Sequence, residues 1–193
     1  MQQKERFYSM CLLCKYEITS IEHRNKCTTV NMNTIKYVDL CKESISKSLM
    51  TYGLCGCSAI LITKYQNNTN KPINIAFAHL VFTETIVDFI NANLVNTNDY
   101  DYYVIVKTPG EYELINGKYE FNTKHKMLWD NILRKRDDYH NVNYEFINYN
   151  INTSLSEDMS YRKLYCNIRY DDEKNYCIYY TDNYGILKPI LSI

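Results

Sequence analysis

Two strongly apolar runs joined by a short polar segment constrain the fold of this chain more than any other feature. The first run extends from Cys57 to Tyr65, and the second, INIAFAHLVF, covers residues 73–82. The residues between them, QNNTNKP, have the composition of a turn. Apolar runs of this length on either side of a turn are typical of buried strands, so the sequence predicts an antiparallel β-hairpin.

The centre of this hairpin determines how Cys57 and His79 are placed. With the centre at Asn68, Cys57 pairs directly with His79, and with the centre at Thr69 the two residues are diagonal neighbours. Their even spacing puts both side chains on one face in either register. Directly opposed residues have Cβ atoms about 5 Å apart, and diagonal ones stay within reach of a long or aromatic side chain. Both registers therefore bring a thiol beside an imidazole, whereas a slip by one residue would separate them.

The segment TYGLCGC, residues 51–57, leads into the first apolar run and contains two of the five glycines of the chain. Gly53 and Gly56 permit a tight turn that presents Cys57 at the start of a strand, and free N–H groups there could hold an oxyanion. A neighbouring imidazolium favours the thiolate, which is the nucleophilic form of cysteine. The Thr51 hydroxyl could orient the imidazole of His79. The alternative is structural, with a buried cysteine and a core histidine.

The same residues resemble the family of cysteine glutamine deamidases. This family includes the chemoreceptor deamidase CheD, the catalytic domain of cytotoxic necrotizing factor and the Burkholderia lethal factor. TYGLCGC is similar to the T-x-G-L-G-S-C pattern of the CheD branch, and LCGC to the L-S-G-C of the toxin branch. The resemblance implies that Cys57 is the nucleophile, His79 the base and Thr51 the residue that orients it. Cys55 and Gly56 depart from the CheD pattern, which has glycine and serine there.

The resemblance also implies an activity. Cys57 would attack the side-chain amide of a glutamine in a partner protein, and hydrolysis of the resulting thioester would leave glutamate. No metal or cofactor is expected for this reaction. Transglutamination and proteolysis pass through the same kind of acyl-enzyme, and the sequence leaves these two alternatives open.

A second set of residues suggests a different function. Cys11, Cys14, His23 and Cys27 have spacing compatible with a structural zinc site, which would indicate a non-catalytic interaction module. Against this, strict apolar alternation through residues 8–18 predicts a strand, which sends Cys11 and Cys14 to opposite faces. Cys55 and Cys57 could instead form a redox pair, although the C-x-C spacing is weak evidence for one.

Composition limits the partners and the compartment that we expect. The 193 residues predict one domain, 1–193, and 22 basic residues balance 22 acidic ones, so nucleic acid and anionic membranes are not expected partners. Without an apolar leader, the eight cysteines are expected to be thiols in the cytoplasm. The abundance of Asn, Ile, Lys and Tyr suggests an AT-rich genome, such as that of a large DNA virus or intracellular bacterium. The substrate would then lie in the host cytoplasm, and the oligomeric state stays open.

The rest of the chain predicts an α+β fold with mostly antiparallel or mixed sheets flanked by a few helices, like that of the deamidases. Helices are expected at 33–49, with Asn33 as the N-cap, at 85–94 and at 124–136. Further strands are expected at 100–110, 142–150, 161–170 and 175–183, and a hairpin with Asn116-Gly117 at its tip is expected at 112–121.

Overall fold

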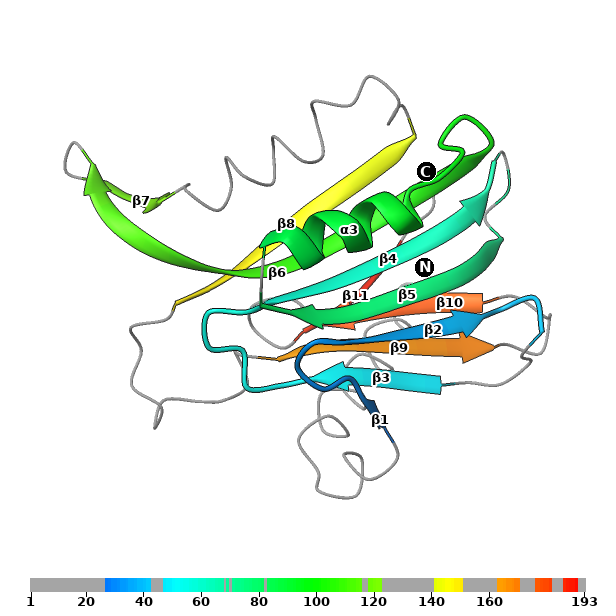
Figure 1. Ribbon diagram of the computed structural model, residues 1–193, viewed down its shortest axis with the longest axis horizontal. Coiled ribbons are helices and arrows are strands. Elements are labelled where there is room, and N and C mark those ends of the chain that lie inside the picture. Colours follow the sequence, from blue (N-terminus) through cyan, green and yellow to red (C-terminus); the bar gives the residue numbers. More distant parts are fainter. Residues whose placement is uncertain are drawn as a thin grey trace, which may run out of the picture.

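The computed structural model shows a protein built mainly of strands (Figure 1). The structure describes residues 27–42, 47–67, 69, 71–81, 83–115, 118–122, 141–150, 163–170, 176–181 and 186–190. Within this part of the chain, two mixed β-sheets and one short helix make up the regular structure.

The first sheet contains five strands in the order β1-β3-β9-β10-β11. β1 is parallel to β3, and the other neighbouring strands are antiparallel. Their bounds are Thr28–Thr29 for β1, Lys47–Thr51 for β3, Leu164–Tyr170 for β9, Tyr176–Thr181 for β10 and Leu187–Pro189 for β11.

The second sheet follows the order β2-β5-β4-β6, and both β7 and β8 pair with the long strand β6. β8 is parallel to β6, whereas all other pairs in this sheet are antiparallel. The bounds are Thr34–Asp39 for β2, Ser58–Gln66 for β4, Pro72–Leu80 for β5, Tyr100–Ile115 for β6, Lys118–Asn122 for β7 and Val142–Asn150 for β8.

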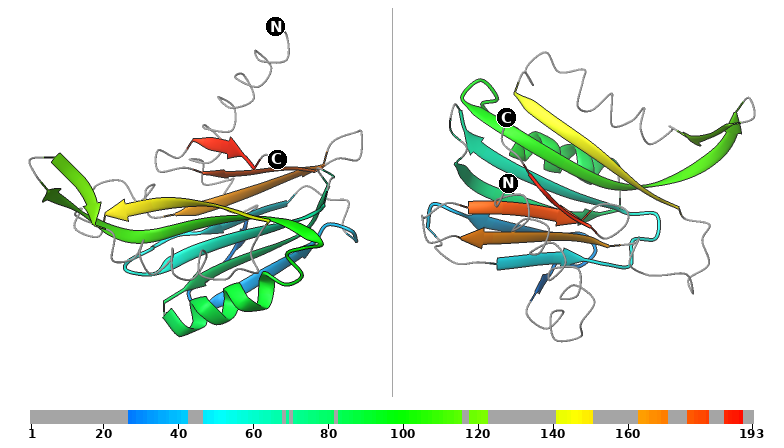
Figure 2. Two further views of the ribbon diagram at one scale, coloured as in Figure 1. Left: turned by 90° about the horizontal axis from the view of Figure 1, so that it is seen from above. Right: turned by 180° about the vertical axis from the view of Figure 1, so that it is seen from behind.

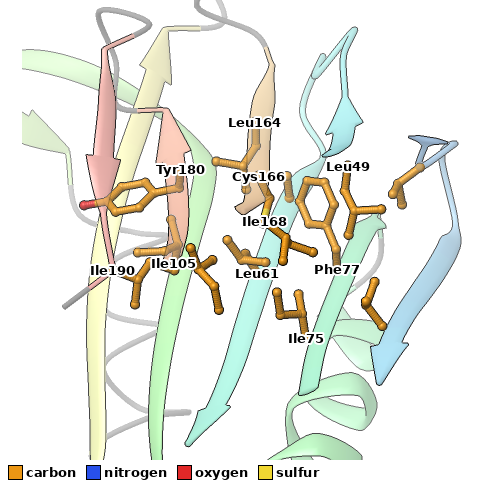
Figure 3. Packing of buried hydrophobic residues seen from close by; sticks show 14 of the residues in the cluster. Leu49, Leu61, Ile75, Phe77, Ile105, Leu164, Cys166, Ile168, Tyr180 and Ile190 are labelled. Carbon is orange, nitrogen blue, oxygen red and sulfur yellow. The ribbon is translucent and has the colours of Figure 1, made fainter. Parts of the chain in front are cut away.

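The two sheets lie face to face, and helix α3 (Thr83–Asn93) covers the outer face of the second sheet, so the molecule has three layers (Figure 2). Side chains from both sheets meet in the space between them (Figure 3). These include Leu49, Cys166 and Ile168 of the first sheet and Leu61, Phe77 and Ile105 of the second. A separate cluster lies under α3 and includes Ile60, Ile62, Phe89 and Ile90.

Burial of both faces explains why β4 and β5 are apolar without interruption. Along β4, Ala59 and Leu61 point between the sheets, while Ile60 and Ile62 point toward α3. A strand covered on both sides reads as a continuous apolar run and not as an alternation. The predicted hairpin is therefore confirmed as β4 and β5, and it forms the middle of the molecule.

Most of the other predicted elements are also confirmed, but the proportion of helix is lower than expected. The helix at 85–94 corresponds to α3, the strand at 142–150 has the predicted bounds, and the strands at 100–110, 161–170 and 175–183 correspond to β6, β9 and β10. The pair Ile115↔Lys118 closes the hairpin of β6 and β7 where it was predicted. The fold is mostly β, with one helix among the described residues. The expected helix at 124–136 and strand at 8–18 lie outside them.

The predicted helix at 33–49 was wrong. This segment contains two strands, β2 and β3, that belong to different sheets. Asn33, the expected N-cap, has a positive φ of 56°, which turns the chain into β2. Thr34, Ile35, Tyr37 and Val38 are β-branched or aromatic residues that favour strands, and pairing of β2 with β5 outweighs the helical spacing of the apolar residues.

The described helix is too short and too polar to cross a membrane. α3 has 11 residues, and no helix in the described part of the chain reaches the length and hydropathy of a membrane span.

Candidate functional site

The predicted site residues come together at the end of the sandwich where the chain passes from one sheet to the other. β3 ends at Thr51, residues 52–57 cross between the sheets, and β4 begins at Ser58 beside the end of β5 (Figure 1). In this connection Gly53 and Gly56 have φ values of 70° and 89°. Glycine adopts these conformations more readily than any other residue, so the two glycines favour the turn that the sequence suggested.

The register of β4 and β5 places Cys57 and His79 on one face. Ala59 pairs with His79, and Ser58 pairs with Leu80, so the hairpin is centred at Thr69. Cys57 lies two residues before Ala59 and is therefore a diagonal neighbour of His79. Ala59 and Cys57 both belong to the core between the sheets, so the thiol and the imidazole face the same interior space.

Thr51 holds the imidazole of His79 across the gap between the sheets. The distance between Thr51 Oγ1 and His79 Nδ1 is 2.7 Å, and both residues are buried. The other ring nitrogen, Nε2, is also buried and has no hydrogen-bond partner among the described residues. A buried polar atom without a partner is costly and calls for an explanation, and a proton-transfer role would supply one.

Burial lowers the pKa of His79 below its ordinary value of about 6.5, and a hydrogen-bonding interaction with the backbone of Val30 opposes this shift to a smaller extent. The neutral imidazole is therefore the favoured form near neutral pH. In the tautomer whose Nδ1–H donates to Thr51 Oγ1, Nε2 carries a lone pair and could accept a proton. These are the properties of a general base. The Val30 backbone, which follows β1, was not suggested by any motif in the sequence.

The lowered pKa of His79 predicts a loss of stability in acid. The unfolded chain binds a proton at His79 near pH 6.5, whereas the folded protein binds it only at lower pH, so this contribution is complete above 6.5 and decreases as the pH falls. We expect the free energy of unfolding to decrease between pH 7.5 and 5.5 by at most about 1.4 kcal/mol per pH unit for this one proton. Urea unfolding of the wild type and His79→Asn measures it. Equal slopes in the two proteins would contradict the prediction.

Tyr149, on β8, fixes the backbone just before β4. Its hydroxyl accepts a hydrogen bond from the N–H of Gly56 at 3.0 Å and donates one to the carbonyl oxygen of Cys57 at 2.6 Å. The Gly56 N–H was expected to help hold an oxyanion, and in this structure it is engaged by the tyrosine. Sequence reasoning missed Tyr149, because it is one of 20 tyrosines and no local pattern marks it.

Replacing Tyr149 by phenylalanine should destabilise the protein by about 2 kcal/mol, since it removes two hydrogen bonds to buried or partly buried backbone groups. Chemical denaturation measures this loss, and hydrogen exchange should show faster opening of residues 53–57. Tyr102→Phe is the matched control, because the Tyr102 hydroxyl donates to the Val95 carbonyl oxygen at 2.6 Å. The control should lose stability without faster exchange at 53–57. Unchanged exchange in Tyr149→Phe would refute the anchoring role.

The site is almost closed in this structure. Cys57 is 6% exposed, whereas Tyr52, Cys55 and Gly56 in the connection that precedes it are exposed. Cys55 is exposed, and neither it nor Cys57 forms a disulfide in this structure.

Of the four residues of the predicted zinc site, the structure describes Cys27. Cys11, Cys14 and His23 lie outside the described residues. Cys27 is half-buried, and burial raises the pKa of its thiol, while hydrogen bonds from Tyr165 and Ser48 oppose that shift. Among the described residues, no group of three or more His, Cys, Asp or Glu side chains could hold a metal ion.

Comparison with known proteins adds no relative. No protein-family model matches this chain, and no curated protein matches it either. The function proposed for this chain therefore comes from the geometry of the site.

Proposed function

We propose that the protein is a cysteine-dependent amidase that converts a glutamine side chain of a partner protein to glutamate. One arrangement carries the proposal. Thr51 holds His79 at Nδ1, Nε2 of His79 is buried without a partner among the described residues, and Cys57 lies on the same interior face. A nucleophile, a base and a group that orients the base are the parts that acyl transfer through a thioester requires.

The reaction would proceed in two halves. His79 Nε2 accepts the thiol proton, and the Cys57 sulfur attacks the carboxamide carbon to form a C–S bond and an oxyanion. Collapse of this intermediate breaks the C–N bond, and the imidazolium gives its proton to the departing ammonia. Water then gives a proton to His79 and attacks the thioester. The C–S bond breaks, glutamate is released, and the thiol regains its proton.

The surroundings of the site support a macromolecular substrate. Tyr52, in the connection above Cys57, is 56% exposed, and Met32 is 59% exposed. Met32 lies next to Asn33, whose N–H donates to the carbonyl oxygen of His79 at 2.6 Å. Exposed apolar side chains around a nearly closed site suit contact with a protein surface better than a free amino acid.

The proposal extends to the fold and the compartment. The motif TYGLCGC and the position of His79 at the end of the next strand support a fold related to the cysteine glutamine deamidases. The nucleophile must stay a thiol, so the reaction belongs in a reducing compartment such as the cytoplasm. For a viral protein or a bacterial effector this would be the host cytoplasm.

The experiment incubates the full chain with a cell extract and follows conversion of glutamine to glutamate by peptide mass spectrometry, with Cys57→Ala as the control. Hydroxylamine, added in parallel, should convert the thioester to a hydroxamate on the same glutamine. Conversion at a defined glutamine that requires Cys57 supports the proposal. Cleaved or amine-linked products would instead indicate a protease or a transglutaminase. Identical peptide profiles for the wild type and Cys57→Ala would refute it.

A further inference from the structure

Lys107 is fully buried inside the β-sandwich. It lies on β6, in the middle of the second sheet, at a position where its neighbours Ile105 and Ile147 belong to the core between the sheets. Lysine is rarely buried to this extent, because removing an ammonium from water is costly unless the protein uses or compensates the charge. Lys107 is therefore an unusual residue for the interior of a β-sandwich.

The strand register places Lys107 beside the candidate site. Ala59 of β4 pairs with His79 of β5 on one side and with Lys107 of β6 on the other. Directly opposed residues of a sheet share a face, so all three side chains point into the space between the sheets. The contact of Ser58 Oγ with Thr108 Oγ1 at 3.0 Å, on the opposite face, shows that the same register continues to the start of β4.

Cys57 comes two residues before Ala59 and is thus diagonal to both Lys107 and His79. Diagonal positions in a sheet lie about 7–8 Å apart, a distance that a long side chain can span. The imidazole on β5 and the lysine side chain on β6 therefore face the same interior space as the thiol. Sequence spacing cannot indicate this, because 50 residues separate Cys57 from Lys107.

We propose that Lys107 is the charge-stabilising residue of the site, and that its ammonium favours the thiolate of Cys57 and the oxyanion formed after attack. This inference depends on the proposed function, since it assigns Lys107 a part in that reaction. The ammonium would also stabilise the oxyanion in place of the Gly56 N–H, which donates to the Tyr149 hydroxyl in this structure. In a water-poor interior, a fixed charge beside a developing anion is an effective form of transition-state stabilisation.

Among the described residues, other titratable groups also face this space. Glu145 of β8 is diagonal to Lys107 in the register, and it accepts a hydrogen bond from the Tyr180 hydroxyl and lies 3.9 Å from the Lys188 ammonium. Burial strongly raises the pKa of Cys166 on β9, so that thiol stays protonated. Tyr149 and His79 hold the contacts described above. Because Glu145 is acidic and diagonal to Lys107, it is the group that would compete with Cys57 for the Lys107 charge.

The test measures the alkylation of Cys57 by iodoacetamide in the full chain at pH 6.0 and pH 9.0, using peptide mass spectrometry. The rate at pH 6.0 is divided by the rate at pH 9.0. This ratio does not depend on the accessibility of the thiol, because the reagent reaches it by the same path at both pH values. A thiol of ordinary acidity, near 8.5, is only about 0.3% ionised at pH 6.0. We expect Lys107→Met to lower the ratio of rates at least fivefold, Lys107→Arg to restore part of it, and thermal unfolding of Lys107→Met to stay cooperative.

Lys64→Met is the matched control, because Lys64 lies on the adjacent strand β4 with its ammonium 3.5 Å from the centre of the Tyr100 ring. It should leave the ratio unchanged. If Lys107→Met leaves the ratio unchanged while His79→Asn lowers it, the Lys107 inference is wrong and the proposed function stands. If Lys107→Met lowers the ratio and His79→Asn does not, the proposal that His79 activates Cys57 is wrong.

Two further outcomes would overturn the inference. If Lys107→Met no longer unfolds cooperatively and Glu145→Gln behaves in the same way, the lysine serves the fold as the partner of Glu145. If Cys57 of the wild type has the rate ratio of an ordinary thiol, neither the proposed function nor the role of Lys107 holds.

Discussion

Cys57→Ala and His79→Asn are each expected to lower the rate of glutamine conversion at least about a thousandfold, because the nucleophile and the base act as one unit. Thr51→Val should cause a smaller loss, about tenfold to a hundredfold, since Thr51 positions the base and transfers no proton itself. The initial rate of conversion of the glutamine identified in the extract, followed by mass spectrometry, measures all three.

The chain offers matched controls for this series. Cys41 and Cys55 are exposed cysteines that form no disulfide, and Cys55 lies only two residues from Cys57. Cys41→Ala and Cys55→Ala should keep activity within about twofold, as surface substitutions away from the reacting atoms usually do. A loss in Cys55→Ala as large as that in Cys57→Ala would contradict the assignment of Cys57 alone as the nucleophile.

Phe77→Ala is expected to lower the free energy of unfolding by about 3–5 kcal/mol. Phe77 is fully buried on β5, and its ring points into the core where side chains of the two sheets meet (Figure 3). Removing the ring leaves a cavity that the paired strands around it cannot close. Chemical denaturation measures the loss.

Tyr37→Ala is the control for Phe77→Ala. It removes an aromatic ring from the neighbouring strand β2, where Tyr37 is 61% exposed and faces away from the core between the sheets. We expect a loss below about 1 kcal/mol. Similar losses for the two variants would contradict the packing of the two sheets described here.

Much of the local structure follows from the sequence, because strong local signals decide it. The β4–β5 hairpin, α3 and the strand at 142–150 are each marked by an apolar pattern. The sequence also predicts that Cys57 and His79 share a face, since both candidate registers have this property. Distinguishing the two registers requires the structure, because the turn residues QNNTNKP are compatible with either.

Contacts between distant strands could not be predicted in the same way. Nothing in residues 33–49 shows that β2 and β3 join different sheets, because helical spacing of apolar residues also fits that segment. Tyr149 of β8 contacts the backbone of Gly56 and Cys57, and Lys107 of β6 pairs with Ala59, and only the pairing of these strands reveals both. Sheet order is set by contacts far apart in sequence, which local patterns do not encode.

Reactivity of Cys57 in the wild type and in His79→Asn tests the central claim most directly. The full chain would be treated with iodoacetamide between pH 6 and 9, and each of the eight cysteines followed by peptide mass spectrometry. The account predicts that Cys57 keeps a larger share of its pH 9 rate at pH 6 than the exposed Cys41 does, and that His79→Asn removes this advantage. A Cys57 profile that matches Cys41, or one that is the same with and without His79, would contradict it.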